Sequence, residues 1–154
     1  MDIIIQSATL NDIPTLLEFK QGVITAERPF DSTLIPGTVK YYNLEMFINS
    51  PDVELLIAKI DDEIVGSGYA RIMKNPKPYF DYLNYAYLGF MYVSPPYRGR
   101  GINEMIISKL KEWARLQGLT ELRLQVYYDN YSAIKAYEKV GFEKHMIKMR
   151  MRLD

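Results

Sequence analysis

The 154-residue chain contains no cysteine and one histidine, His145. Without cysteine the chain forms no disulfide bond, uses no thiolate nucleophile and offers no thiolate ligand to zinc. One histidine does not supply the several imidazole ligands of a histidine-based metal centre. His145 lies in a run of alternating polar and apolar residues, where histidine is more often structural than catalytic. We therefore expect no metal cofactor.

Net charge is also absent, because 19 lysines and arginines balance 19 aspartates and glutamates. Proteins that bind nucleic acids without regard to sequence usually carry a positive excess, so we expect no nucleic-acid partner. The N-terminus lacks a basic region followed by an apolar stretch, and no apolar run reaches membrane-spanning length. The sequence thus predicts a cytoplasmic protein with no membrane partner.

Apolar residues make up 48% of the chain, which is enough for one domain of residues 1–154 with a buried core. Hydrophobic periodicity and turn residues predict helices that begin at Asn11 or Asp12, span 41–48 and 101–117, and follow Asn130. The predicted strands are 3–8, 53–60, 64–73, 82–93, 122–127 and one after Gly141, and 27–38 is predicted as a loop. The order β-α-α-β-β-β-α-β-α-β indicates an α/β fold of the α+β type, with a mixed sheet and helices on both faces.

The most informative motif spans residues 90–103. A strand ends at two prolines, and the chain then turns through Gly99 and Gly101 and enters a helix. Glycines let backbone N–H groups turn inward, and the first turn of a helix leaves N–H donors unpaired at the positive end of its dipole. This arrangement predicts an anion site that fits a pyrophosphate. It is neither a P-loop nor a dinucleotide fingerprint, because the Gly-Lys-Ser/Thr ending and a third glycine are missing.

A second motif follows the strand predicted at 122–127. Residues 130–142 read Asn-Tyr-Ser-Ala-Ile-Lys-Ala-Tyr-Glu-Lys-Val-Gly-Phe. At about 100° per residue, the steps from Asn130 to Tyr137 make nearly two helical turns. Both side chains therefore lie on one helix face and can contact one ligand.

The two motifs together resemble those of the GNAT superfamily of N-acetyltransferases, which use acetyl-CoA. The fixed places of that family's loop, Arg/Gln-x-x-Gly-x-Gly/Ala, are held here by Arg98, Gly101 and Asn103. Asn103 departs from the family pattern, which has a small residue at this position. The family's closing segment, Asn-x-x-Ala-x-x-x-Tyr-x-x-x-Gly-Phe, is matched by Asn130, Ala133, Tyr137, Gly141 and Phe142. The resemblance extends over essentially the whole chain and implies the GNAT acyl-CoA N-acyltransferase fold.

The resemblance also implies roles for individual residues. The end of the strand through 90–93 would pair with the pantetheine arm of CoA, and a backbone N–H near Phe90 or Met91 would hold the thioester oxygen. Asn130 would either bind the pantetheine or hold the turn before its helix. Tyr137 would protonate the leaving thiolate. The implied cofactor-binding residues are Met91, Tyr92, Val93, Arg98, Gly99, Arg100, Gly101, Ile102, Asn103, Asn130 and Tyr137.

The general base is less clearly marked. A lysine-like amine must lose a proton before it attacks, and at neutral pH this step costs roughly 4 kcal/mol. Many GNAT relatives place a carboxylate on the central strand, but residues 82–93 contain neither Asp nor Glu. Glu27, Asp31 and Asp81 are expected to flank the acceptor site. We choose Glu27 as the catalytic base, acting through water.

The sequence therefore predicts an acyltransferase that transfers the acetyl group of acetyl-CoA directly to a primary amine of a small molecule or peptide in a ternary complex. Two alternatives stay open. The first is a non-catalytic module that binds acyl-CoA or has a regulatory role, which Asn103 and the absent strand carboxylate favour. The second is an acyltransferase that acts on a hydroxyl group or uses a longer acyl chain. The chain after Gly141 is long enough for one strand, whereas many relatives have two. The acceptor site is then either open or completed by a second subunit of a homodimer.

Overall fold

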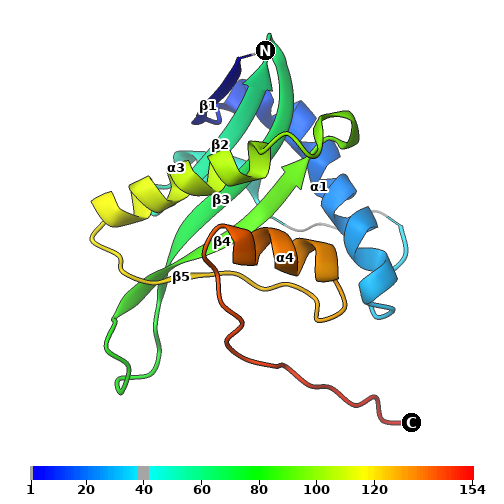
Figure 1. Cartoon of the computed structure of the whole chain (residues 1–154), viewed down its shortest axis with the longest axis vertical. Helices are drawn as coiled ribbons and strands as arrows, with labels where there is room; N and C mark the ends of the chain where they lie inside the picture. The colour runs from blue at the N-terminus through cyan, green and yellow to red at the C-terminus, as the bar shows by residue number, and fades with distance from the viewer. Residues whose placement is uncertain (1, 38–41) are drawn as a thin grey trace.

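Residues 2–37 and 42–154 are described by a computed structural model of the chain (Figure 1). Within them, five strands form one sheet in the order β1-β2-β3-β4-β5. The strand bounds are β1 (Ile3–Ser7), β2 (Val53–Ile60), β3 (Glu63–Lys74), β4 (Asn84–Val93) and β5 (Leu122–Arg123). Strands β1 to β4 pair antiparallel, whereas β5 runs parallel to β4. The sheet is therefore mixed, as the sequence predicts.

Four α-helices are present in the same part of the chain, namely α1 (Ile13–Glu27), α2 (Leu44–Asn49), α3 (Ile102–Leu116) and α4 (Tyr131–Lys139). Short 3₁₀ turns cover Leu10–Asp12, Arg28–Phe30 and Pro95–Tyr97. Local capping agrees with these bounds. The Asn43 side chain accepts a hydrogen bond from the Met46 amide at 3.1 Å and begins α2, and Gly118, with a φ of 78°, follows the end of α3.

The sheet separates two apolar clusters (Figure 1). Side chains alternate along a strand, so Leu55 and Ile57 of β2 pack with α1 and α2, while Leu56 and Ala58 pack with α3. Helix α4 borders the α3 side through Tyr137, which is partly buried against that cluster. Helices thus cover both faces of the sheet.

Strand β4 carries a bulge where it pairs with β3. The pairs Ser67–Tyr92 and Tyr69–Gly89 leave Phe90 and Met91 together opposite one β3 residue. Phe90 has a φ of 56°, a left-handed conformation that is unfavourable for a bulky residue. The fully buried Ser67 hydroxyl donates a hydrogen bond to the Phe90 carbonyl oxygen at 3.0 Å. A buried side-chain contact therefore holds the bulge.

The structure corrects four of the element predictions. Glu27 is the last residue of α1, and not the first of a loop, and α2 begins at Leu44. Residue 41, predicted to begin that helix, lies outside the described residues. Of the strand predicted at 122–127, only Leu122 and Arg123 are paired, with Ala86 and Tyr87 of β4.

The fourth correction concerns the predicted final strand, which is wrong for this chain by itself. Residues 143–154, called the tail below, contain no strand, and no backbone-to-backbone hydrogen bond joins them to the described part of the chain. A strand needs a paired edge, and the tail runs from the end of α4 away from the sheet (Figure 1). The observed order is β-α-α-β-β-β-α-β-α.

We predict that Ser67→Ala lowers the free energy of unfolding by about 1–3 kcal/mol, because the Phe90 carbonyl loses its buried donor. Chemical denaturation followed by circular dichroism measures this change. Ser108→Ala, at an exposed serine on α3, is the control and should change stability by less than about 0.5 kcal/mol. Equal effects of the two substitutions would show that the Ser67 hydroxyl does not hold the bulge.

Candidate functional site

Strands β4 and β5 run together only at their start. Ala86 pairs with Leu122 and Tyr87 with Arg123, and the Ala86 amide donates to the Glu121 carbonyl at 2.9 Å. Beyond Tyr87, the described part of β4 pairs with β3 on one side and with no strand on the other. The backbone of residues 91–93 therefore offers a free edge, meaning one with no strand partner, at which the Val93 carbonyl accepts a hydrogen bond from the Arg98 Nε. An extended ligand can add to such an edge as another strand would.

The chain turns next to this edge and enters α3. Gly99 and Gly101 both have a φ of 78°, a conformation that glycine adopts without strain, and Gly101 is the N-cap of α3. The first helical bond runs from the Met105 amide to the Gly101 carbonyl at 3.0 Å, and no side chain caps the helix start. The amides of Ile102 and Asn103 precede that bond at the positive end of the helix dipole. The predicted anion site has the required backbone geometry.

One arginine joins this loop to the end of β4, and a second packs within the loop. The Arg98 Nε donates to the Val93 carbonyl at 2.9 Å, and its guanidinium lies 5.7 Å from the centre of the Tyr92 ring. The Arg100 guanidinium lies 5.2 Å from the centre of the Tyr97 ring. In these positions the arginine side chains hold the loop in shape. We therefore expect the loop backbone, more than the arginine charges, to form the anion site.

The Tyr92 ring packs against Gly22 of α1, a residue that the sequence analysis did not single out. A Cβ atom added at Gly22 would lie 2.7 Å from atoms of this ring, and the Phe19 ring centre is 4.8 Å from the Tyr92 ring centre. Only glycine admits so close an approach. The available signal was an isolated glycine inside a helical pattern.

Asn130 begins α4. Its Oδ1 accepts a hydrogen bond from the Ala133 amide at 3.3 Å, which is the N-cap contact that favours asparagine at this position. The family resemblance implied two roles for Asn130. The contact present in the structure is that of the second role, in which Asn130 holds the turn. The same cap fixes where α4 starts and therefore where its later residues point.

Tyr137 lies two turns further along α4. Its ring centre is 5.8 Å from that of Phe142, with the two planes at 78°, and both rings pack against the α3-side cluster. Burial raises the pKa of Tyr137 to about 12, and the neighbouring Tyr87 and the charge of Glu27 add to this effect. The hydroxyl is therefore protonated throughout the neutral range and available as a donor.

Glu27 and Asp31 lie near each other where α1 ends. Burial raises the pKa of Glu27, and the negative charge of Asp31 raises it further. Hydrogen bonds from Thr33, and then one from the Tyr127 hydroxyl at 2.8 Å, lower the pKa of Asp31 to about 2. A carboxylate with a raised pKa is the better base near neutral pH. The structure thus distinguishes Glu27 from Asp31.

The two catalytic candidates, Glu27 and Tyr137, come from distant parts of the sequence, and the structure brings them within electrostatic reach. Tyr87 of β4 lies in the same group. Asp81, which we also expected beside the acceptor site, is in the loop between β3 and β4, which lies away from the end of α1 (Figure 1), and it is not among the charges that shift the pKa of Glu27 or Tyr137. It is therefore no part of this group.

Residues 2–37 and 42–154 contain no cluster of three or more histidine or carboxylate side chains able to hold a metal ion. In the same residues no helix has both the length and the apolar character of a membrane span.

The chain is similar to known proteins over the residues of this site and over most of its length. A family model described as "Acetyltransferase (GNAT) family" matches residues 24–142. An acetyltransferase of Pectobacterium atrosepticum is 35% identical over 123 residues, which cover 80% of each protein. The chain spans 28% and 60% of the lengths of two other similar acetyltransferases.

Solved structures share the fold. A predicted acetyltransferase of Clostridium acetobutylicum, solved with acetyl-CoA, has a TM-score of 0.78 at 17% identity over 98% of this chain and 96% of its own. AAC(6')-Iy, solved with a bisubstrate analogue of CoA and acetylneamine, has a TM-score of 0.74 at 22% identity over 99% and 100% of the two chains. The family model and the Pectobacterium relative decide the assignment, and the chain belongs to the acetyltransferase (GNAT) family of acyltransferases.

Proposed function

We propose that this chain is an N-acetyltransferase that transfers the acetyl group of acetyl-CoA directly to a primary amine. The observation that carries the proposal is the position of the glycine loop at the start of α3, directly after the free edge of β4. An anion site followed by an open strand edge suits a ligand with a pyrophosphate at one end and an extended amide-containing arm, as CoA has. Acetyl-CoA is present in the Clostridium structure with the same fold.

Acetyl-CoA would occupy the site in three parts. Backbone amides of residues 99–103 would hold the pyrophosphate, with Arg98 and Arg100 keeping the loop in shape. The backbone of residues 91–93 would pair with the pantetheine. Tyr137 would stand by the sulfur. Asn103, where the family usually has a small residue, is partly buried and brings an amide that can donate to a phosphate oxygen.

The reaction needs a base, an oxyanion donor and a proton for the leaving group. Glu27 accepts the proton of the amine through a water, and the amine nitrogen then attacks the thioester carbon. The bulge at Phe90 interrupts pairing with β3, so an amide at Phe90 or Met91 can donate to the oxyanion. The attacking nitrogen then loses its second proton to solvent. As the C–S bond breaks, Tyr137 donates a hydrogen bond to the sulfur, and CoA leaves as a thiolate that solvent protonates. No covalent enzyme intermediate forms.

The high pKa of Tyr137 shapes its contribution. A phenol with a pKa of about 12 does not readily give its proton to a thiolate, whose conjugate acid has a pKa of about 8.5. Its hydrogen bond to the sulfur strengthens as negative charge develops, which selectively stabilises the transition state. Tyr137 therefore keeps its proton, and the departing thiolate takes its proton from solvent.

We propose that the acceptor is a cationic small molecule or peptide with a primary amine. The carboxylates Glu27 and Asp31 lie next to Tyr137 and Tyr127, so the acceptor side of the site is acidic and aromatic. Two proteins of this fold are described as aminoglycoside acetyltransferases, and aminoglycosides are cationic amines. We further propose that residues 1–154 act as a single domain in the cytoplasm.

One observation favours a second candidate function. Strand β4 contains no carboxylate, so any base comes from α1, and this also suits a module that binds acyl-CoA without turnover. The two functions share the cofactor site and differ in whether Tyr137 and Glu27 affect a rate. The first experiment below tests the shared cofactor site, and the second and third separate the two functions.

We predict that Gly101→Asp abolishes micromolar binding of acetyl-CoA measured by calorimetry, because it puts a negative charge into the phosphate site. Gly101→Asn is the matched control, since it has the same size and meets the same unfavourable φ without the charge. It should retain more than a tenth of the wild-type affinity. Wild-type protein that does not bind acetyl-CoA would contradict both candidate functions.

We predict that Tyr137→Phe lowers kcat by about 100-fold and leaves the dissociation constant of acetyl-CoA within about twofold, because the hydroxyl acts only as the thiolate leaves. Release of CoA is followed with a thiol reagent against a panel of primary amines. Tyr131→Phe changes an exposed tyrosine of the same helix and should leave kcat unaltered. Full activity of Tyr137→Phe would remove the hydroxyl from the mechanism.

We predict that Glu27→Gln lowers kcat/KM by about 10–100-fold near neutral pH. The wild-type rate should fall as the pH drops through the raised pKa of Glu27, because the protonated carboxyl accepts no proton. The deficit of the variant should shrink at high pH, where the amine loses its proton without help. Glu18→Gln, at an exposed position on α1, is the control. A deficit that does not change with pH would contradict the role of base.

A further inference from the structure

A cavity of about 490 Å³ lies between the first half of α1 and the start of α2. This volume is within the range of pockets that bind small molecules. Much of the cavity wall is apolar or aromatic, and its uncharged residues are Ile13, Leu17, Tyr42, Asn43 and Leu44. Leu17 is 44% exposed at this wall. The apolar surface is therefore accessible to a ligand.

Lys20 supplies a positive charge to the same cavity. Its exposed fraction is 8%, and it is the only buried charged residue in the described part of the chain. Within residues 2–37 and 42–154, its only hydrogen bond runs from Nζ to the Tyr42 carbonyl oxygen, at a long 3.4 Å. A lysine ammonium has three N–H donors. Two of them are therefore available to a ligand.

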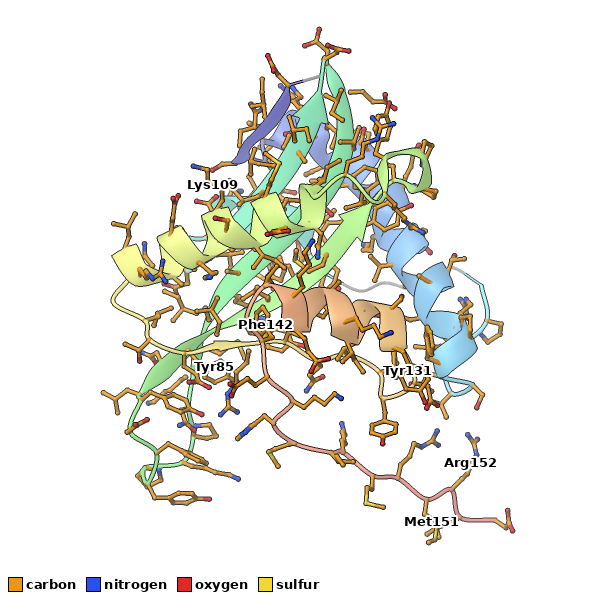
Figure 2. All side chains as sticks on the ribbon, viewed as in Figure 1. Tyr85, Lys109, Tyr131, Phe142, Met151 and Arg152 are labelled. Carbon is orange, nitrogen blue, oxygen red and sulfur yellow. The ribbon has the colours of Figure 1, made fainter. Side chains whose placement is uncertain are left out.

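Two exposed lysines of this chain contrast with Lys20. The Lys109 ammonium of α3 (Figure 2) lies 3.4 Å from the Glu112 carboxylate, and Lys139 lies 3.7 Å from Glu104. Among the described residues, no carboxylate lies within ion-pair distance of Lys20. A buried cation without an opposite charge is costly, and an anion in the cavity would reduce that cost.

We propose that this cavity binds a small monocarboxylate with an apolar body. The carboxylate oxygens accept hydrogen bonds from the Lys20 ammonium, and the hydrocarbon covers Ile13, Leu17 and Leu44. One ammonium suits a single negative charge. A phosphate would need further donors, but no arginine is among the described lining residues, and Glu45 adds a negative charge to the same wall. An inorganic anion would leave the apolar wall uncovered.

The cavity is separate from the proposed acetyl-CoA site. Lys20 precedes Glu27 on α1 by two helical turns, or about 10 Å along the helix axis. None of the described lining residues belongs to the glycine loop, to the free edge of β4 or to the group around Glu27. The Tyr42 ring centre lies 5.3 Å from that of Phe90, so the two sites share one layer of packed side chains. The inference goes beyond the proposed function and does not depend on it.

The first experiment titrates octanoate into protein with ¹³C-labelled isoleucine and leucine methyl groups and follows them by NMR. We expect saturable shifts at Ile13, Leu17 and Leu44, with a dissociation constant of about 1 mM or lower. Acetate has the charge without the body, and 1-octanol has the body without the charge. Both should bind at least about tenfold more weakly. Equal binding of 1-octanol, or shifts confined to other methyl groups, overturns the proposal.

The second experiment removes the charge. Lys20→Met keeps a side chain of similar length and should weaken octanoate binding at least about tenfold, because the charge-assisted hydrogen bond is lost. Lys109→Met makes the same change at an exposed lysine of α3 and should leave the affinity within about twofold. Circular dichroism confirms that each variant is folded. Unchanged affinity in folded Lys20→Met would show that Lys20 has only a structural role.

A third experiment leaves Lys20 in place, so it does not depend on the folding of Lys20→Met. Leu17 is partly exposed and lies one turn before Lys20, where a carboxylate can pair with the ammonium and repel an anionic ligand. Leu17→Glu should therefore bind octanoate at least about tenfold more weakly than Leu17→Gln, which has the same size without the charge. Equal affinities of these two variants contradict the proposal. No measurement here involves acetyl-CoA, so failure is distinct from failure of the proposed function.

Discussion

The separation of β5 from β4 after Tyr87 is the constraint on which the rest of this structure depends. Backbone N–H and C=O groups in a sheet must be paired, and a strand that loses its neighbour presents a row of unpaired groups. Here the loss occurs in the second half of β4, directly before the glycine loop that leads into α3. The free edge and the unpaired amides of the helix start are therefore continuous. One extended anionic ligand can satisfy both.

The same separation leaves α4 and the tail with little to pack against. Tyr137 is partly buried between α4 and the α3-side cluster, and this burial raises its pKa. Glu27 reaches the same region from the end of α1, where burial raises its pKa as well. Both groups are shifted toward their protonated forms. The raised pKa keeps the Tyr137 hydroxyl protonated. In Glu27 it brings the pKa of the carboxylate closer to that of a useful base.

Much of the fold could be predicted from the sequence because its signals are local. Apolar residues repeated at the strand and helix periods predicted the bounds of β2, β3, β4 and α3 to within about two residues, and Gly118 marked the end of α3. The glycine loop was predictable because Gly99 and Gly101 need no partner to adopt a positive φ. For Asn130 the sequence left two roles open, and the N-cap contact with Ala133 is the one present in the structure.

Other features depend on residues far apart in the chain. The contact of Gly22 with Tyr92, the support of the Phe90 bulge by Ser67, and the exclusion of Asp81 from the group around Glu27 have no local signature. The predicted final strand failed for the same reason. Its alternating pattern shows that residues 143–154 can form a strand, but a pattern does not say which edge the strand will join.

The sequence by itself determined the family, the order of most helices and strands, and the loop at which the cofactor is proposed to bind. The family follows from the resemblance of two motifs, and the elements and the loop follow from periodicity and turn residues, which act over a few residues. Only the tertiary structure decided that β4 opens at Tyr87, that Glu27 lies near Tyr137, and that the tail stays unpaired within one chain. The physical reason is that pairing and burial are properties of surfaces brought together by folding, and single segments do not carry them.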